Sequence, residues 1–193
     1  GHLLEVIPQN IGFREFRMDD GLMKLNGKRI VFKGTNRHEF DCYSGRAADP
    51  AEIEKDIIIM KQHNINMVRT SHYPNAANFY AMMDHFGLWA CDEADLEDHA
   101  NQSISEMESW IPAFVDRITR LVTRDRNHPC VAMWSLGNEA GAGSNFKACY
   151  DEARRLDPSR PVHYEGTRIS KPYGGETYSD FYSKMYPDIE WME

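Results

Sequence analysis

The stretch that decides the fold is Val131-Ala132-Met133-Trp134-Ser135-Leu136-Gly137-Asn138-Glu139. A buried strand of a parallel sheet reads as a continuous apolar run, and this run ends in an amide and a carboxylic acid. In a barrel of parallel strands, polar residues at the carboxyl end of a strand lie where active sites form. The alternative is an ordinary solvated strand end. The stretch alone leaves these two interpretations equally weighted.

The rest of the chain repeats the order of a strand followed by a helix. After a hairpin signal at Asn26-Gly27, strands are predicted over residues 29–34, 66–71, 88–94, 131–136 and 161–166, with a possible sixth over 180–185. Helices are predicted over residues 50–60, 75–85, 111–122 and 145–156. Asp49 is expected to cap the first helix, Gly87 to end the second and Ser144 to cap the last.

This alternation predicts an α/β fold with a parallel sheet and crossover helices. We expect a (β/α)8 TIM barrel that is incomplete and holds the first five or six strand–helix units, because such barrels usually need about 250 residues. A doubly wound sheet is the alternative. No GxGxxG or GxxxxGK[ST] loop follows any predicted strand, which removes support from its phosphate-binding versions.

Length and charge limit the classes of protein to consider. The chain has 193 residues, enough for one sizeable core, and a formal net charge of −8. The acidity argues against a general nucleic-acid binder, which needs a basic surface. No apolar run approaches the roughly 20 residues that span a bilayer, so no membrane partner is expected. The first residues lack the basic and apolar regions of a signal peptide.

The four cysteines lie at positions 42, 91, 130 and 149, without a CxxC spacing. Cys91 and Cys130 stand inside apolar runs, where a cysteine usually serves as a small buried hydrophobe. We therefore expect reduced thiols and a cytoplasmic location. Two disulfides are the alternative.

Ionisable side chains recur at the predicted strand ends. The candidates for one shared pocket are His38, His72, Glu97, His99 and Glu139. Glu97 and His99 form a Glu-x-His pair, which together with a second carboxylate suits a hard cation such as Mg²⁺ or Mn²⁺. The alternative for the acidic run at residues 95–98 is a solvated loop.

Several motifs together resemble glycoside hydrolase family 2. The two signatures of the family are similar to the stretches at residues 69–74 (RTSHYP) and 127–139, and residues 25–28 and 33–39 resemble its entry into the catalytic barrel. Within the family, residues 71–75, the Glu97-x-His99 pair and residues 137–141 look like the large, metal-dependent β-galactosidases. The β-glucuronidases are less similar, since they usually have Asn-Glu-Pro at the acid.

The resemblance implies a retaining hydrolase that cleaves terminal β-D-galactosides, such as lactose, with an acid/base and a nucleophile. Glu139 matches the general acid/base, and Asn138 matches the residue that binds the sugar 2-hydroxyl. Glu97, His99 and Glu139 match the ligands of an active-site Mg²⁺, for which Mn²⁺ is a substitute. The remaining matches are sugar-contacting histidines at His38 and His72, and a tyrosine beside the nucleophile at Tyr186.

Parts of the family pattern have no counterpart in the sequence. No carboxylate near its end follows an apolar strand as the family's nucleophile does, so we expect the nucleophile beyond Glu193 and little activity from the chain alone. Phe40-Asp41 and Asp98 also depart from the family motifs. We interpret residues 1–20 as a remnant of a preceding β domain, a linker or a tag, and residues 21–193 as the first part of the catalytic barrel.

Three further expectations concern partners and alternatives. An unclosed barrel exposes sheet edges and apolar surface, so we expect a homo-oligomer. The alternative activity is that of a β-glucuronidase or another family 2 glycosidase. The alternative of a different class is a catalytically silent, carbohydrate-binding barrel.

Overall fold

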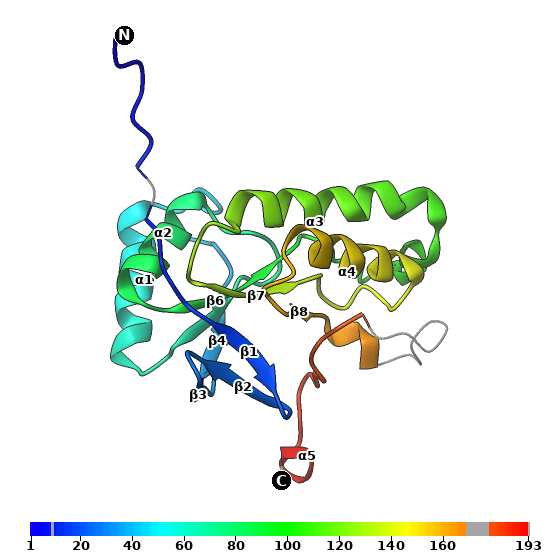
Figure 1. Cartoon of the computed structure of the whole chain (residues 1–193). Helices are drawn as coiled ribbons and strands as arrows, with labels where there is room; N and C mark the ends of the chain where they lie inside the picture. The colour runs from blue at the N-terminus through cyan, green and yellow to red at the C-terminus, as the bar shows by residue number, and fades with distance from the viewer. Residues whose placement is uncertain (9, 169–177, 193) are drawn as a thin grey trace.

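The molecule is built around a five-stranded parallel sheet flanked by helices, with a three-stranded antiparallel sheet beside it (Figure 1). The computed structural model describes residues 1–8, 10–168 and 178–192. The strands are β1 (Phe16–Asp19), β2 (Leu22–Leu25), β3 (Lys28–Arg29), β4 (Gly34–Asn36), β5 (Met67–Arg69), β6 (Trp89–Glu93), β7 (Val131–Ser135) and β8 (Val162–His163). The α-helices are α1 (Pro50–Gln62), α2 (Ala77–Phe86), α3 (Ile111–Asp125), α4 (Ser144–Leu156) and α5 (Ile189–Met192). The 3₁₀ helices are η1 (Gln102–Glu106), η2 (Glu108–Trp110) and η3 (Glu165–Arg168).

The strands of the parallel sheet follow one another in chain order, from β4 to β8. α1, α2, α3 and α4 each connect one strand to the next. A barrel is wound in this way, whereas a doubly wound sheet reverses its strand order. The predicted incomplete (β/α)8 barrel is therefore confirmed.

The chain enters the barrel differently from the prediction. Asn26-Gly27 forms the expected turn, with positive φ angles of 49° and 76°, and joins β2 to β3. The predicted strand over residues 29–34 is wrong, because Arg29 ends the antiparallel pairing and the parallel sheet begins only at Gly34. One apolar run therefore serves as a connection between two sheets rather than as a strand.

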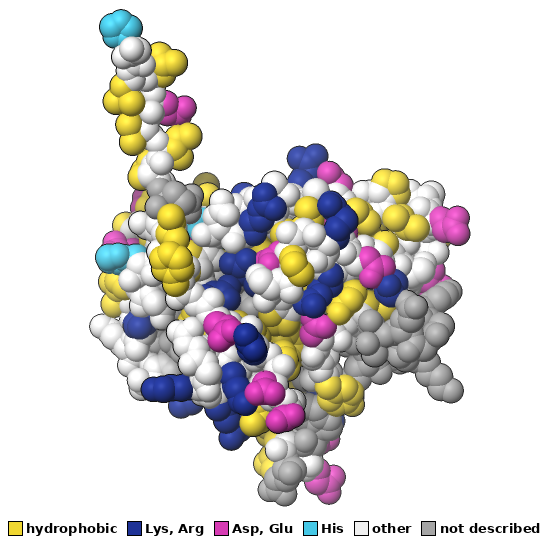
Figure 2. Space-filling view, in the orientation of Figure 1, with side chains coloured by type: hydrophobic (Ala, Val, Ile, Leu, Met, Phe, Trp, Pro, Cys, Tyr) yellow, Lys and Arg dark blue, Asp and Glu magenta, His cyan; other side chains and the backbone are white. Residues whose placement is uncertain are grey.

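The chain before β1 extends away from both sheets (Figure 1), and Figure 2 shows apolar side chains along it. Leu3, Leu4, Val6 and Ile7 are exposed. Arg14 fastens this segment to the barrel, since its Nε donates a 2.7 Å hydrogen bond to the carbonyl of Pro129.

The helix ends test three of the sequence predictions. Asp49 caps α1 by accepting a 2.7 Å hydrogen bond from the Ala51 N–H, and Gly87 ends α2 in a left-handed conformation with φ 69°, both as predicted. The prediction for α4 is wrong, because Gly143 holds the cap position and Ser144 is already helical. A Cβ at Gly143 would lie 2.1 Å from the Ser105 carbonyl oxygen, so this close approach requires glycine there.

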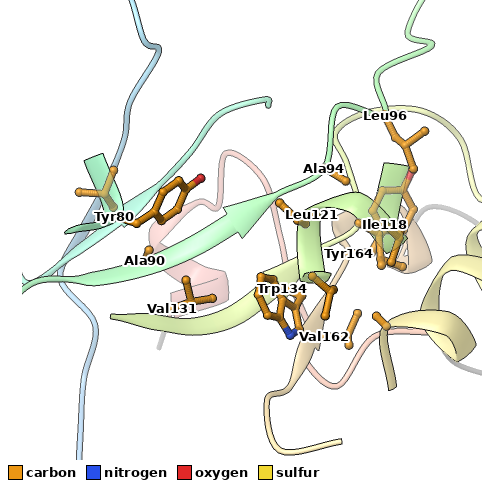
Figure 3. Close-up of a cluster of buried hydrophobic side chains, with 14 of the residues drawn as sticks. Tyr80, Ala90, Ala94, Leu96, Ile118, Leu121, Val131, Trp134, Val162 and Tyr164 are labelled. Atoms are coloured by element: carbon orange, nitrogen blue, oxygen red, sulfur yellow. The ribbon is translucent and has the colours of Figure 1, made fainter. Parts of the chain in front are cut away.

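The two faces of the parallel sheet carry two apolar clusters. On the helix-facing side, Ala90, Trp134, Val162 and other buried side chains pack against the helices (Figure 3). On the opposite side, Met67, Cys91, Ala132 and Met133 form a smaller cluster. Because successive side chains of a strand point to opposite faces, the second cluster marks the interior of the barrel.

No strand forms over residues 180–185, so a sixth strand there is wrong. The Asp180 N–H instead donates a 2.7 Å hydrogen bond to the Val162 carbonyl, and the Asp180 carboxylate accepts one of 2.7 Å from the Val162 N–H. This segment therefore lies beside the end of β8 without extending the sheet.

Two further properties follow from the described residues. All four cysteines are free thiols, and three of them are buried. No helix in the described ranges combines the length and apolar character needed to cross a bilayer.

Candidate active site

The β7 strand delivers Asn138 and Glu139 to the carboxyl edge of the sheet. All residues of β7 are buried, as the opening stretch predicts. Gly137 follows, and a Cβ there would lie only 2.4 Å from the Leu96 carbonyl oxygen. The same oxygen accepts a 3.0 Å hydrogen bond from the Asn138 N–H. The chain after β7 is therefore pressed against the loop that follows β6.

Asn138 is buried and its amide is fully oriented. Its Oδ1 accepts a 3.0 Å hydrogen bond from Arg69 Nη2. Its Nδ2 donates to Glu97 Oε1 at 3.0 Å and lies 3.4 Å from Glu139 Oε2. Because Arg69 donates only, the amide oxygen must face Arg69 and the amide nitrogen must face the carboxylates.

Glu139 has a left-handed backbone, with φ 46°, and its side chain is 31% exposed. Its N–H donates a 2.5 Å hydrogen bond to Glu165 Oε1, just beyond β8. Glu165 is buried and its Oε2 has no partner among the described residues. Burial raises the pKa of the Glu165 carboxyl. Glu139 thus reaches solvent while a second, buried carboxyl holds its backbone.

Glu93, at the end of β6, is fully buried and accepts four hydrogen bonds. Arg69 donates to both carboxylate oxygens, at 2.6 and 3.0 Å, and the His72 ring Nδ1 lies 2.6 Å from Oε1. Ser135 Oγ donates to Oε2 at 2.6 Å. The site candidates drawn from the sequence include neither Glu93 nor Arg69. The signal that marks them is period-two alternation, since each lies two residues after an inward apolar residue, Cys91 or Met67.

The two predicted histidines lie together. The rings of His38 and His72 meet edge to face, with centroids 5.4 Å apart. Tyr73 places its hydroxyl 3.4 Å from His38 Nδ1. His38 is exposed, so its ring is accessible from solvent.

The predicted metal ligands converge only in part. His99 Nε2 lies 3.9 Å from Glu139 Oε1, while Glu97 is tied to the Asn138 amide. In the described ranges, no three His, Cys, Asp or Glu side chains form a group that could hold a metal ion. The donor types, two carboxylates and an imidazole, nevertheless fit a hard divalent cation. Both Asp98 oxygens are also buried without a partner in the described chain, which leaves negative charge to be balanced there.

Tyr186 lies apart from the other predicted site residues. Its side chain is 87% exposed. Among the described residues, no hydrogen bond joins Tyr186 to the six other candidates.

Comparison with known proteins places this arrangement in a family. The profile of "Glycosyl hydrolases family 2, TIM barrel domain" matches residues 16–193. The chain belongs to glycosyl hydrolases family 2. The resemblance drawn from the sequence is thereby confirmed, and the fold is part of the TIM barrel domain of that family.

Curated members of the family are similar over most of the chain. Beta-galactosidase BgaC of Bifidobacterium adolescentis is 44% identical over 100% of this chain and 19% of its own length. A beta-galactosidase of Pectobacterium atrosepticum is 47% identical over 86% of this chain and 16% of its own. One of Klebsiella pneumoniae is 45% identical over 97% of this chain and 18% of its own. This chain thus spans less than a fifth of the length of these relatives.

Two solved structures are similar to this chain in fold. The β-D-glucuronidase of Dictyoglomus thermophilum has 29% identity and a TM-score of 0.69, over 79% of this chain and 28% of that one. A Ruminococcus gnavus β-glucuronidase has 28% identity and a TM-score of 0.76, over 89% of this chain and 31% of that one.

Proposed function

We propose that the whole protein is a retaining glycoside hydrolase that cleaves terminal β-D-galactosides, such as lactose. The observation that carries this proposal is the pair formed by Asn138 and Glu139 at the carboxyl end of β7. The amide is held from one side by Arg69 and faces the carboxylate on the other. Relatives named beta-galactosidase at 44–47% identity support the choice of sugar.

In the proposed mechanism Glu139 is the general acid/base. It protonates the glycosidic oxygen as the aglycone leaves and later removes a proton from the attacking water. Asn138 donates from its amide to the sugar 2-hydroxyl, and His38 and His72 contact the other hydroxyls. Hydrogen bonds that strengthen as the ring gains oxocarbenium character stabilise the transition state more than the substrate.

A retaining mechanism also needs a nucleophilic carboxylate about 5–5.5 Å from the acid/base. Glu93 and Glu165 are the carboxylates at the ends of β6 and β8, and both are buried away from solvent, with both oxygens of Glu93 and one oxygen of Glu165 accepting hydrogen bonds. Neither is therefore free to attack a sugar. We propose that the nucleophile comes from a part of the barrel outside this chain, with Tyr186 beside it.

We further propose that Glu97, His99 and Glu139 hold Mg²⁺, with Mn²⁺ as a substitute. The donor types suit a hard cation, and Asp98 and Glu165 add unbalanced carboxylates nearby. A cation bound there would supply positive charge beside the acid/base carboxyl. Titration calorimetry with Mg²⁺ tests this on the full-length protein. Glu97→Gln should weaken binding about tenfold or more, while the exposed Glu108→Gln on η2 should leave it unchanged. Equal affinities would contradict the assignment.

Substrate profiling of the full-length protein tests the choice of sugar. We expect turnover of nitrophenyl β-D-galactoside and lactose, and little turnover of the matching glucuronide. The structural likeness to β-glucuronidases, at 28–31% identity, favours glucuronide as the second candidate. Faster hydrolysis of the glucuronide would replace the galactoside proposal with that one. Hydrolysis of neither would favour a silent, carbohydrate-binding barrel.

The surroundings of the protein are also proposals. Four free thiols support a reducing, cytoplasmic compartment. Edge strands β4 and β8 of the parallel sheet support self-association. Light scattering of the purified 193-residue chain measures its oligomer directly, and a monomer at high concentration would contradict a homo-oligomer.

A further inference from the structure

The interior face of the sheet carries an apolar layer followed by a polar layer. Met67, Cys91 and Met133 belong to the apolar layer. Two residues further along the same strands stand Arg69, Glu93 and Ser135, listed in the order β5, β6, β7. Glu93 is in register with Ser135, and Ser135 with His163 of β8. Arg69 is in register with Cys91, and its side chain reaches forward to Glu93. The polar layer therefore spans four neighbouring strands directly beneath the candidate active site.

Glu93 is the only carboxylate in this layer of the described strands, and every contact it makes is with a donor. Arg69 Nε and Ser135 Oγ reach Oε2, each at 2.6 Å. Arg69 Nη2 reaches Oε1 at 3.0 Å and His72 Nδ1 reaches the same oxygen at 2.6 Å. The Glu93 side chain is fully buried, so no water competes for these bonds.

These contacts fix the state of His72. A carboxylate offers acceptors only, so His72 Nδ1 must carry the proton that it shares with Glu93. Nε2 is then the nitrogen left to meet a ligand. Setting the tautomer of an imidazole through the bond that its other nitrogen makes is a general use of such a partner.

The same carboxylate acts on Asn138 through Arg69. The guanidinium is held in a two-point contact by Glu93, and its Nη2 also donates to Asn138 Oδ1 at 3.0 Å. If the Asn138 amide were flipped, its Nδ2 would face Arg69 Nη2, and two hydrogen-bond donors would oppose each other. Glu93 therefore decides, through one rigid arginine, which end of the amide faces Glu139.

We propose that Glu93 is a positioning residue that orients His72 directly and Asn138 through Arg69 for sugar binding in the transition state. This inference rests on the proposed glycosidase function. It assigns no chemical step to Glu93, which is buried beneath the residues that would meet the substrate.

Replacement by glutamine isolates this role because it keeps the size of the side chain. The glutamine amide has one oxygen that accepts hydrogen bonds, whereas the glutamate has two. The amide nitrogen, which only donates, takes the place of the other oxygen. On the Oε1 side it faces His72 and Arg69, and on the Oε2 side it faces Arg69 and Ser135. Either way the arginine loses one of its two contacts and its counter-charge.

The test is steady-state kinetics of full-length Glu93→Gln with an aryl β-galactoside. We expect kcat to fall by about 10–100-fold, the range for removal of a partner that orients a ligand residue, while KM changes by less than about threefold. We also expect the double variant E93Q/N138A to lose clearly less than the product of the two single losses, because the residues act along one path. A structural role alone would not produce that coupling.

Asp92→Asn is the matched control. It also exchanges a buried carboxylate for an amide in β6, but Asp92 points to the helix layer and contacts Tyr80. Its kcat should remain within about threefold of wild type. If E93Q does not fold, Arg69→Lys replaces it, since lysine cannot span Glu93 and Asn138, and the same loss of kcat is expected.

The outcomes separate this inference from the function on which it rests. A wild-type protein that hydrolyses no β-glycoside would overturn both. An active wild type whose folded E93Q variant keeps its kcat, or whose double variant shows the full product of losses, would overturn the role of Glu93 alone.

Discussion

The backbone N–H of Glu139 donates a 2.5 Å hydrogen bond to Glu165 Oε1, which joins the chain after β7 to the chain after β8. Glu139 has φ 46° at this point, a conformation that residues other than glycine adopt only when their surroundings hold them. A buried side chain on the neighbouring strand end therefore sets the direction of the proposed acid/base.

This relationship predicts that Glu165 matters for turnover through its oxygen rather than its charge. Glu165→Ala removes the acceptor, and a misplacement of about 1 Å in a reacting group can cost about 10²-fold in rate. Glu165→Gln keeps a carbonyl oxygen for the Glu139 N–H, so most of the kcat should return. Kinetics of both full-length variants check this. Equal losses in the two would show that the charge is what counts.

The buried Asp92 predicts a pH dependence of stability. Burial and the neighbouring Asp125 raise the pKa of Asp92 well above its usual range, and Tyr80 donates a 2.5 Å hydrogen bond to it. The folded state thus holds a proton that the unfolded state releases above about pH 4, so stability falls as pH rises through that range. The unfolding free energy of Asp92→Asn relative to that of wild type should therefore increase with rising pH, by up to about 1.4 kcal/mol per pH unit.

Urea midpoints measured from pH 4.5 to 7.5 check the effect of Asp92→Asn. Asp151→Asn is the control, because Asp151 is exposed on α4 and pairs with Lys147. A difference between Asp92→Asn and wild type that stays constant over this range would contradict the prediction.

The buried His163 predicts a pH dependence of stability with the opposite sign in the acidic range. Burial and the Arg69 cation lower its pKa to about 4. Between pH 6.5 and that value the unfolded state binds a proton that the folded state refuses, so stability falls as the pH falls. His163→Gln can still donate to Ser135 and accept from Ser183, the two partners of the ring, each at 3.1 Å. The variant should lose less stability than wild type on acidification. If the unfolding free energies of His163→Gln and wild type fell in parallel as the pH fell, this would argue against a neutral His163.

Gly137 predicts a steric requirement beside the active site. An added Cβ would lie 2.4 Å from the Leu96 carbonyl oxygen and 2.9 Å from Leu96 Cβ, so the loop after β6 must move. Gly137→Ala should cost about 1–3 kcal/mol of unfolding free energy and lower kcat by displacing Asn138 and Glu139. Urea unfolding and kinetics measure both effects. Wild-type stability and turnover would show that the loop gives way freely.

The sequence predicted those parts of the fold that depend on local patterns. The apolar run at residues 131–135 became β7 and was buried throughout. The Asp49-Pro50 start of α1 and the Gly87 end of α2 follow from capping chemistry, which acts over a few residues. The apolar residues at 30–32 misled the prediction, because strand patterning cannot tell a strand from a connection between two sheets.

The parts that escaped prediction depend on contacts between distant segments. Arg69, Glu93 and Ser135 are far apart in the chain. The pairing of β6 with β7 sets Glu93 beside Ser135, and the side chain of Arg69, which is in register with Cys91, reaches forward to Glu93. Glu165 ended a predicted strand, but its bond to the Glu139 backbone depends on how β7 and β8 pair. Gly143 replaced Ser144 as the cap because Ser105 of η1 packs against it. None of these contacts between distant segments can be recognised from the sequence immediately around the residues that make them.

The proposal that Glu139 is the acid/base is tested most directly by Glu139→Gln in the full-length protein, assayed with and without azide. The account predicts a fall in kcat of about 10²–10⁴-fold on lactose, whose leaving group needs protonation, and a much smaller fall on an activated aryl galactoside. Azide should restore turnover of the aryl substrate and yield the β-galactosyl azide. Wild-type turnover of lactose by the variant would contradict the assignment of Glu139.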